Sequence, residues 1–82
     1  MYAVEFSKTA EKQFDKLKEN TQNRILDVLE RIKIRPFHFV KRKQGPLYFI
    51  LRVGDYRAVL YIKQDKNIIF VIEVGHRKKI YK

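Results

Sequence analysis

The sequence predicts an α+β domain: a mostly antiparallel four-stranded sheet packed against an N-terminal helical hairpin, in the order β-α-α-β-β-β. Three observations support this prediction. A short alternating segment opens the chain, two segments with apolar residues at helical spacing follow, and three strand-like runs fill the second half. No linker, repeat or low-complexity segment interrupts the 82 residues, so we expect one domain, 1–82.

The first strand and the first helix are predicted from the opening residues. YAVEF, residues 2–6, alternates and is rich in aromatic and β-branched side chains, which indicates a short strand. Ser7 is suited to cap a helix, and Glu11 stands in the first turn, where a carboxylate interacts favourably with the helix dipole. The predicted helix ends near Asn20, and one apolar stripe runs along it: Ala10, Phe14 and Leu17.

A second helix is predicted between Thr21, which offers a cap, and Pro36, which cannot continue a helix. Its apolar stripe is wider than that of the first helix: Ile25, Val28, Leu29 and Ile32. The two helices form an antiparallel hairpin. Each helix has one apolar face, and we expect both faces to pack against a sheet.

The second half supplies the strands of that sheet. Residues 37–46, bounded by two prolines, are predicted to be a loop. Three strand-like runs follow, separated by Gly54-Asp55 and by residues 64–66: LYFILRV (47–53), YRAVLYIK (56–63) and NIIFVIEV (67–74).

Side chains alternate between the two faces of the middle predicted strand. One face is apolar and aromatic and is expected to pack on the helices: Tyr56, Ala58, Leu60 and Ile62. The other presents cationic and aromatic groups: Arg57, Val59, Tyr61 and Lys63.

The charge is concentrated in the second half of the chain. The net charge is +10, and residues 1–35 hold eight basic and six acidic side chains whereas residues 36–82 hold eleven and three. The second half therefore has a charge of +8, which attracts polyanions, with nucleic acid ahead of acidic protein or anionic membrane. A solvated, solubilising face is the alternative explanation.

The composition argues against several classes of function. The chain has no Cys and only two isolated His, His38 and His76, so we expect no disulfide, no structural zinc and no cofactor. The longest apolar runs, such as IIFVI at 68–72, are far shorter than the roughly 20 residues that a bilayer requires, and no leader segment opens the chain. We expect a soluble cytoplasmic protein with no membrane partner.

Two motifs then point to a family. LRVGDYRAVLYI at 51–62 and VIEVGHRKKIY at 71–81 resemble the RelE/ParE toxin superfamily, and RelE-like toxins most closely. The resemblance covers essentially the whole chain. It implies a RelE-like fold and the toxin of a type II toxin–antitoxin system, which pairs with a cognate antitoxin in a hetero-oligomer. RelE-type members cleave mRNA in the ribosomal A site, whereas ParE-type members poison DNA gyrase.

The resemblance also implies a catalytic set. Arg57 and Arg77 match the family's phosphate and transition-state stabilisers, a role that suits the permanently charged, two-pronged guanidinium group. Tyr81 matches the family's terminal Tyr, and a cationic surrounding favours a phenolate that can transfer a proton. His76 is a further candidate for proton transfer, although a His after a strand is commonly a hydrogen-bonding spacer.

Other cations are candidates for binding RNA: Lys41, Arg42, Lys43, Arg52, Lys78 and Lys79. The chain departs from the RelE pattern in one respect. Where that pattern has lysines in the strand before the LR motif, this sequence has Tyr48 and Ile50, so the expected lysine base is missing. We hypothesise that the 41–43 triplet reaches the same space from the preceding loop.

Three functions stay open at this stage. The leading hypothesis is a metal-independent, ribosome-dependent mRNA endonuclease that uses the substrate 2′-OH as its nucleophile. The alternatives are a ParE-like gyrase poison and a basic RNA- or antitoxin-binding module without catalysis. The GHR-x-x-Y ending favours the first, because a protein that only blocks gyrase has no need of residues directed at a phosphate.

Overall fold

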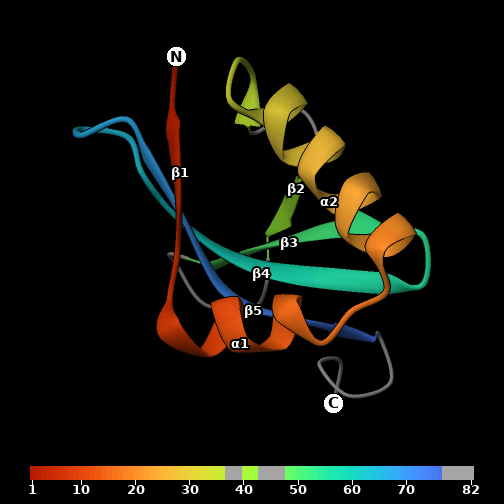
Figure 1. Ribbon diagram of the computed structural model, residues 1–82. Helices are drawn as coiled ribbons and strands as arrows, with labels where there is room; N and C mark the ends of the chain where they lie inside the picture. Colours follow the sequence, from red (N-terminus) through yellow and green to blue (C-terminus); the bar gives the residue numbers. More distant parts are fainter. Residues whose placement is uncertain (37–39, 43–47, 77–82) are drawn as a thin grey trace.

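The computed structural model describes residues 1–36, 40–42 and 48–76 (Figure 1). Two α-helices and five strands follow in the order β1 (Ala3–Phe6), α1 (Lys8–Asp15), α2 (Glu19–Ile32), β2 (Val40–Arg42), β3 (Tyr48–Val53), β4 (Tyr56–Lys63) and β5 (Ile68–His76). The predicted α+β class and the mostly antiparallel sheet are confirmed.

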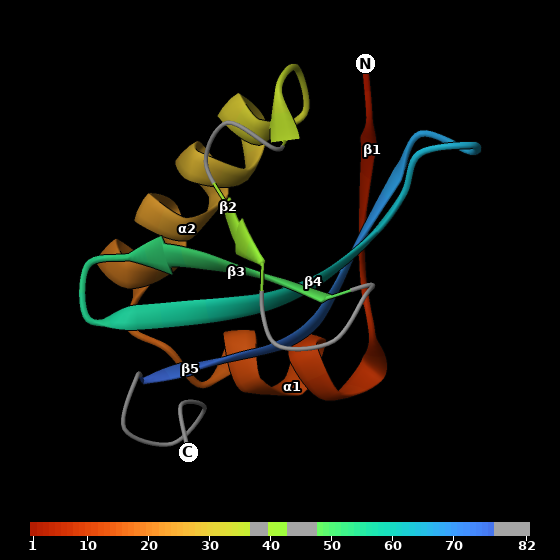
Figure 2. The ribbon, with the colours of Figure 1, turned by 180° about the vertical axis from the view of Figure 1, so that it is seen from behind.

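The strands form one sheet in the order β1-β5-β4-β3-β2. β1 runs parallel to β5, and the other three pairings are antiparallel. Figure 2 shows the other side of the molecule, where β3 passes in front of α2. Both helices contribute to a core on one side of the sheet, so the opposite side is left without a helix among the described residues.

The predicted alternation of β4 is confirmed. Ala58, Leu60 and Ile62 are buried against the helices. They meet buried side chains of both helices and of the neighbouring strands: Ala10, Ile25, Leu29, Ile32, Leu51, Val53, Ile69, Val71 and Val74. Because alternate side chains point to opposite faces, the positions between them are on the far side of the sheet.

Ser7 fixes the start of α1 to β5, and its predicted capping role is confirmed. Its Oγ accepts a hydrogen bond from the Ala10 amide at 3.0 Å and donates one to the Ile72 carbonyl at 2.8 Å. The register shifts here, because Val59 pairs with Glu73 and Leu60 with Val71. Ile72 is therefore the extra residue of a β-bulge, and the Ser7 hydroxyl binds its otherwise unpaired carbonyl.

We expect Ser7→Ala to lower the free energy of unfolding by about 1–2 kcal/mol, because both the helix cap and the bond to the bulge are lost. Urea denaturation followed by circular dichroism measures the change. Thr9→Ala, at an exposed position in the same turn, is the control and should cost less than about 0.5 kcal/mol. Equal losses in the two variants would contradict the role given to Ser7.

The boundary between the helices differs from the prediction. α1 ends at Asp15 rather than near Asn20, because the Leu17 amide turns back to the Phe14 carbonyl at 3.0 Å. Lys18, in an extended conformation, is the N-cap of α2, so the prediction of Thr21 as the cap was wrong. Leu17 packs on the core from the connecting turn rather than from the helix.

The sheet has five strands rather than the predicted four, because a short edge strand forms within the predicted loop. Val40–Arg42 pairs with β3 opposite residues 49–51 and satisfies backbone groups that the β3 edge would otherwise expose. The rest of that predicted loop lies outside the described residues. β5 begins at Ile68, after Asn67 in a left-handed turn conformation (φ 55°), and continues to His76 because its pairing with β4 extends to Tyr56.

Two further findings concern the described residues. No helix within 1–36, 40–42 and 48–76 is long and apolar enough to cross a bilayer. Within the same ranges, no group of three or more His, Asp or Glu side chains could hold a metal ion.

Candidate functional site

The sheet side opposite the helices, which we call the far face, has two arginines at one end. Arg52 of β3 lies directly opposite Arg57 of β4, and Gly75 of β5 lies on the other side of Arg57. Like charges directly opposite each other in a sheet are unfavourable, so the pair favours a bound anion. Arg52 is exposed, whereas Arg57 is half-buried with its Nε atom inside the protein. Gly75 adds no side chain beside Arg57.

An aromatic row crosses the other end of the far face. Tyr48, Tyr61 and Phe70 are opposite one another on β3, β4 and β5. The Tyr48 and Tyr61 ring centroids are 6.1 Å apart, and the Tyr61 and Phe70 rings stack at 6.3 Å with 19° between their planes. The ammonium group of Lys63 lies 6.0 Å from the Tyr61 centroid and 5.9 Å from that of Phe70.

The arginine pair and the aromatic row are separated by one row that continues across three strands: Ile50 and Val59, which are buried, and Glu73 of β5, which is exposed. Arg57 and Tyr61 are four residues apart on one strand, or about 13 Å at the usual rise per residue. Phosphate oxygens suit guanidinium groups, and unstacked bases suit aromatic rings. The far face therefore has the two kinds of group that bind single-stranded nucleic acid, a short distance apart.

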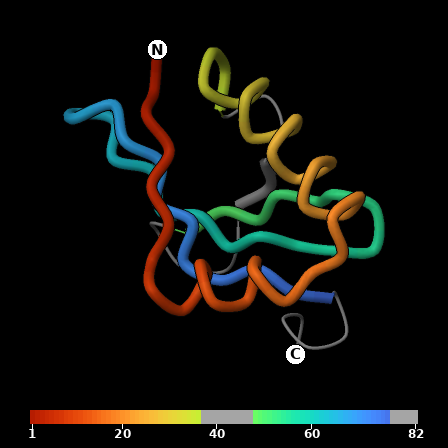
Figure 3. Tube along the Cα trace, viewed as in Figure 1, coloured from red at the N-terminus to blue at the C-terminus, as the bar shows by residue number. Residues whose placement is uncertain are grey.

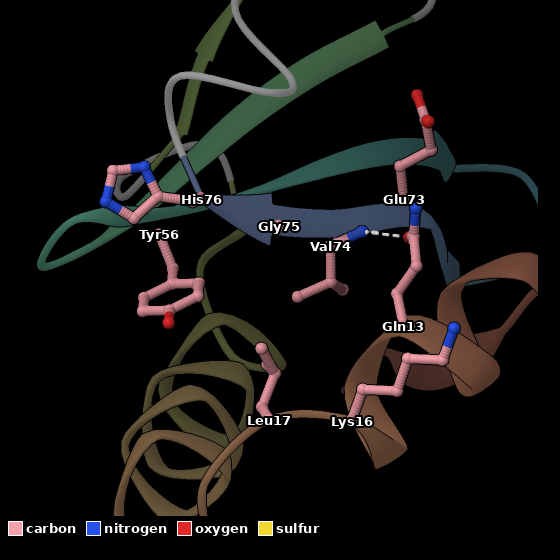
Figure 4. Close-up of a pocket in the computed structure, with 8 residues that line it drawn as sticks. All are labelled: Gln13, Lys16, Leu17, Tyr56, Glu73, Val74, Gly75 and His76. Carbon is pink, nitrogen blue, oxygen red and sulfur yellow. Dashed lines mark hydrogen bonds between the residues drawn. The ribbon is translucent and has the colours of Figure 1, made fainter.

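His76 lies on the helix side of the sheet. It pairs with Tyr56, and the two rings meet edge to face with centroids 5.6 Å apart (Figure 4). They line a pocket of about 420 Å³ together with residues of α1 and the turn after it: Gln13, Lys16 and Leu17. The Val74 amide donates to Gln13 Oε1 at 2.7 Å and holds α1 against this end of β5.

The sequence and the fold of this chain are similar to those of known proteins. The family described as "ParE toxin of type II toxin-antitoxin system, parDE" matches residues 4–81 of the chain. The chain belongs to this toxin family. No curated protein sequence matches it significantly.

Solved structures of RelE toxins share the fold of this ParE-family chain. The toxin of the intact E. coli RelBE complex is 26% identical, with a TM-score of 0.81 over 93% of this chain and 96% of its own. The toxin of the Mycobacterium tuberculosis RelBE2 complex is 24% identical, with a TM-score of 0.83 over 93% of this chain and 98% of its own. The toxin of the RelB–RelE complex of Methanococcus jannaschii is 26% identical, with a TM-score of 0.74 over 94% of each chain. The predicted RelE/ParE membership is confirmed.

The structure brings together some of the predicted site residues of this family member and separates others. Arg52 and Arg57 are neighbours on the far face, whereas His76 packs against Tyr56 on the helix side. Arg77 and six other residues stay predictions, because they or their side chains lie outside the described part of the chain: Lys41, Arg42, Lys43, Lys78, Lys79 and Tyr81. The backbone of Lys41 lies opposite Ile50 in β2.

Phe70 and Lys63 were not among the predicted site residues. Phe70 sits in an apolar run that predicts only a buried strand, and its place in the aromatic row depends on the register across the bulge. Tyr48, which replaces a lysine of the RelE pattern, is the exposed end of that row. Alternation within β4 could have indicated Lys63, since it shares a face with Arg57 and Tyr61.

Proposed function

We propose that this chain is the toxin of a type II toxin–antitoxin system and that it cleaves mRNA on the ribosome. The observation that supports this best is the cross-strand pair Arg52–Arg57 beside an aromatic row on the same face. A phosphate between the two guanidinium groups would relieve their repulsion, and neighbouring bases could stack on the rings. Its site of action would then be the cytoplasm, where translation takes place.

The reaction requires little covalent chemistry from the protein. The substrate 2′-OH attacks the adjacent phosphorus, the bond to the 5′ oxygen breaks, and a 2′,3′-cyclic phosphate and a free 5′-OH result. Arg57, with Arg77, would stabilise the negative charge that builds on the phosphorane oxygens. A proton must leave the 2′-OH and another must reach the departing oxygen, a task for Tyr81. His76, the other predicted candidate, packs against Tyr56 on the helix side and is less suited to this task. Lys41, Arg42, Lys43, Lys78 and Lys79 would contact RNA phosphates.

A second candidate function is that of a ParE-like gyrase poison. The match to the ParE family over residues 4–81 favours it, and so does the absence of strand lysines at positions 48 and 50. The far face weighs against it, because a paired set of guanidinium groups is suited to phosphate. A basic binding module without catalysis is the third possibility.

The test is to sequence the 5′ ends of cellular RNA after brief induction of the protein. We expect new 5′-OH ends inside translated messages, in register with codons, and none when Arg57→Ala is induced. An assay of DNA gyrase supercoiling runs alongside. Inhibited gyrase with intact messages would support the ParE-like function instead. If messages stay intact and gyrase stays active, the binding module without catalysis is the function that remains.

We also propose an antitoxin partner. Solved RelE relatives from E. coli, M. tuberculosis and M. jannaschii are complexes with antitoxins. With +8 in residues 36–82, this chain would attract an acidic, amphipathic protein whose apolar residues cover exposed side chains such as Leu26 and Ile34. We expect such a protein, encoded by a neighbouring gene, to co-purify at physiological salt as a hetero-oligomer. Purification of the chain alone from its native host would contradict this.

A further inference from the structure

A second group of arginines surrounds a cleft at the end of the sheet. The cleft, of about 300 Å³, lies between α2 and the β3–β4 turn, which are side by side in Figure 3. Arg24 and Arg31 line it from α2, Arg52 lines it from β3, and Asp27 is the one acidic side chain that lines it among the described residues. Arg24 and Arg31 are seven residues apart, close to two helical turns, and so project from the same side of α2.

The β3–β4 turn holds one of these arginines in place. Gly54 has a φ of +59°, a left-handed conformation that favours glycine. A Cβ atom at Gly54 would lie 3.0 Å from Nη2 and 3.3 Å from Nη1 of Arg24. The guanidinium group of Arg24 therefore packs directly on the glycine, at a place where a larger residue would displace it.

The positive charge of the cleft is not balanced within the described structure. Among residues 1–36 and 48–76, none of the three arginines has a carboxylate oxygen within 4.0 Å, whereas Lys33 on the same helix is paired with Glu30. With Arg52 assigned to the far face, Arg24 and Arg31 against Asp27 still leave one excess positive charge in the cleft. Because the groups are exposed, screening by water makes this arrangement tolerable, and an anion would make it favourable.

Arg52 connects this cleft to the far face. It lies opposite Arg57 and also lines the cleft. β2 pairs with β3 only as far as Leu51, so among the described residues no strand covers the β3 edge at Arg52. Arg52 is therefore next to both groups of arginines, the far-face pair and the two on α2.

We propose that this cleft binds a backbone phosphate of RNA, next to the phosphate held by Arg52 and Arg57. The proposal rests on the proposed function in one respect: RNA, rather than another polyanion, is taken as the occupant of the far face. The phosphate belongs either to the message or to ribosomal RNA, since both present the same phosphodiester group. Arg24 and Arg31 are then RNA-binding residues outside the reacting centre.

The test compares two double variants that lose the same charge: Arg24→Ala/Arg31→Ala in the cleft, and Lys8→Ala/Lys12→Ala at exposed positions of α1. Fluorescence anisotropy gives the affinity for a single-stranded 12-nucleotide RNA and for vacant ribosomes between 50 and 300 mM KCl, taken as roughly the range over which counterion release is measurable. Circular dichroism checks that each full-length variant is folded.

We expect the cleft variant to lose about tenfold in affinity, and its slope of log affinity against log salt to fall by about 0.7, the value for one phosphate contact to single-stranded RNA. The control should change little. A loss with the 12-nucleotide RNA assigns the phosphate to the message, whereas a loss with ribosomes alone assigns it to ribosomal RNA.

Equal slopes for the cleft and control variants on both ligands would overturn the proposal. So would a cleft variant that keeps its affinity for RNA but loses its affinity for an acidic antitoxin. Failure of the proposed function gives a different result. A wild-type chain that binds RNA with the expected salt dependence but cleaves no message would refute the nuclease function, while the proposal that the cleft binds a phosphate would stand.

Discussion

Replacing Arg57 by alanine is expected to lower the single-turnover rate of mRNA cleavage by about 10²–10³-fold, or about 2.7–4 kcal/mol of transition-state stabilisation. Arg57 lies on the far face opposite Arg52, with its Nε atom buried, so its guanidinium group is held in position before substrate binds. Charge builds on the phosphorane only in the transition state. Ribosome binding should therefore fall much less than cleavage, as measured on programmed ribosomes.

Matched variants separate the charge of Arg57 from its shape and from its packing. Arg57→Lys retains the positive charge but loses the two parallel donors, so an intermediate rate is expected. Arg77→Ala should behave like Arg57→Ala, and Tyr81→Phe tests whether a hydroxyl group transfers the proton. Lys66→Ala, at an exposed position in the β4–β5 turn, removes one charge and should cleave at the wild-type rate. If Arg57→Ala and Arg77→Ala, both folded, cleave at the wild-type rate, the far face is not a catalytic site.

Leu60→Ala is expected to have the largest effect on stability, a loss of about 2–5 kcal/mol in the free energy of unfolding. Leu60 is 0% exposed, in the middle of β4, where it contacts the core between β3 and β5. Domains of this size have only about 5–15 kcal/mol of stability, and shorter chains tend toward the lower end. The variant should therefore unfold at much lower urea concentration, or populate the unfolded state without denaturant.

Leu26→Ala is the control for this experiment. Leu26 of α2 lies beside Val4 and Phe6 and is 43% exposed, so its truncation should cost about 1 kcal/mol or less in urea denaturation followed by circular dichroism. A loss of similar size at both positions would show that the core of this domain does not depend on the close packing around Leu60.

The sequence by itself determined the features that depend on local pattern. Alternation in residues 56–63 assigned Leu60 to the core and Arg57 to the opposite face, and both assignments are confirmed because a strand admits only two faces. Ser7 was predicted as a cap from its place before an apolar stripe. The motifs at 51–62 and 71–81 were sufficient to indicate the toxin superfamily, since they include residues from the sheet and from the end of the chain.

The tertiary structure decided the features that join residues far apart in the chain. The bond from Ser7 to Ile72 spans 65 positions, and the bulge at Ile72 sets which residues of β5 face Tyr61. The aromatic row, the opposed arginines and the packing of Arg24 on Gly54 each depend on such a pairing of separate elements. Local periodicity specifies the face that a side chain takes, but register and contact between elements arise only when the whole domain packs, because they depend on the fit of distant surfaces.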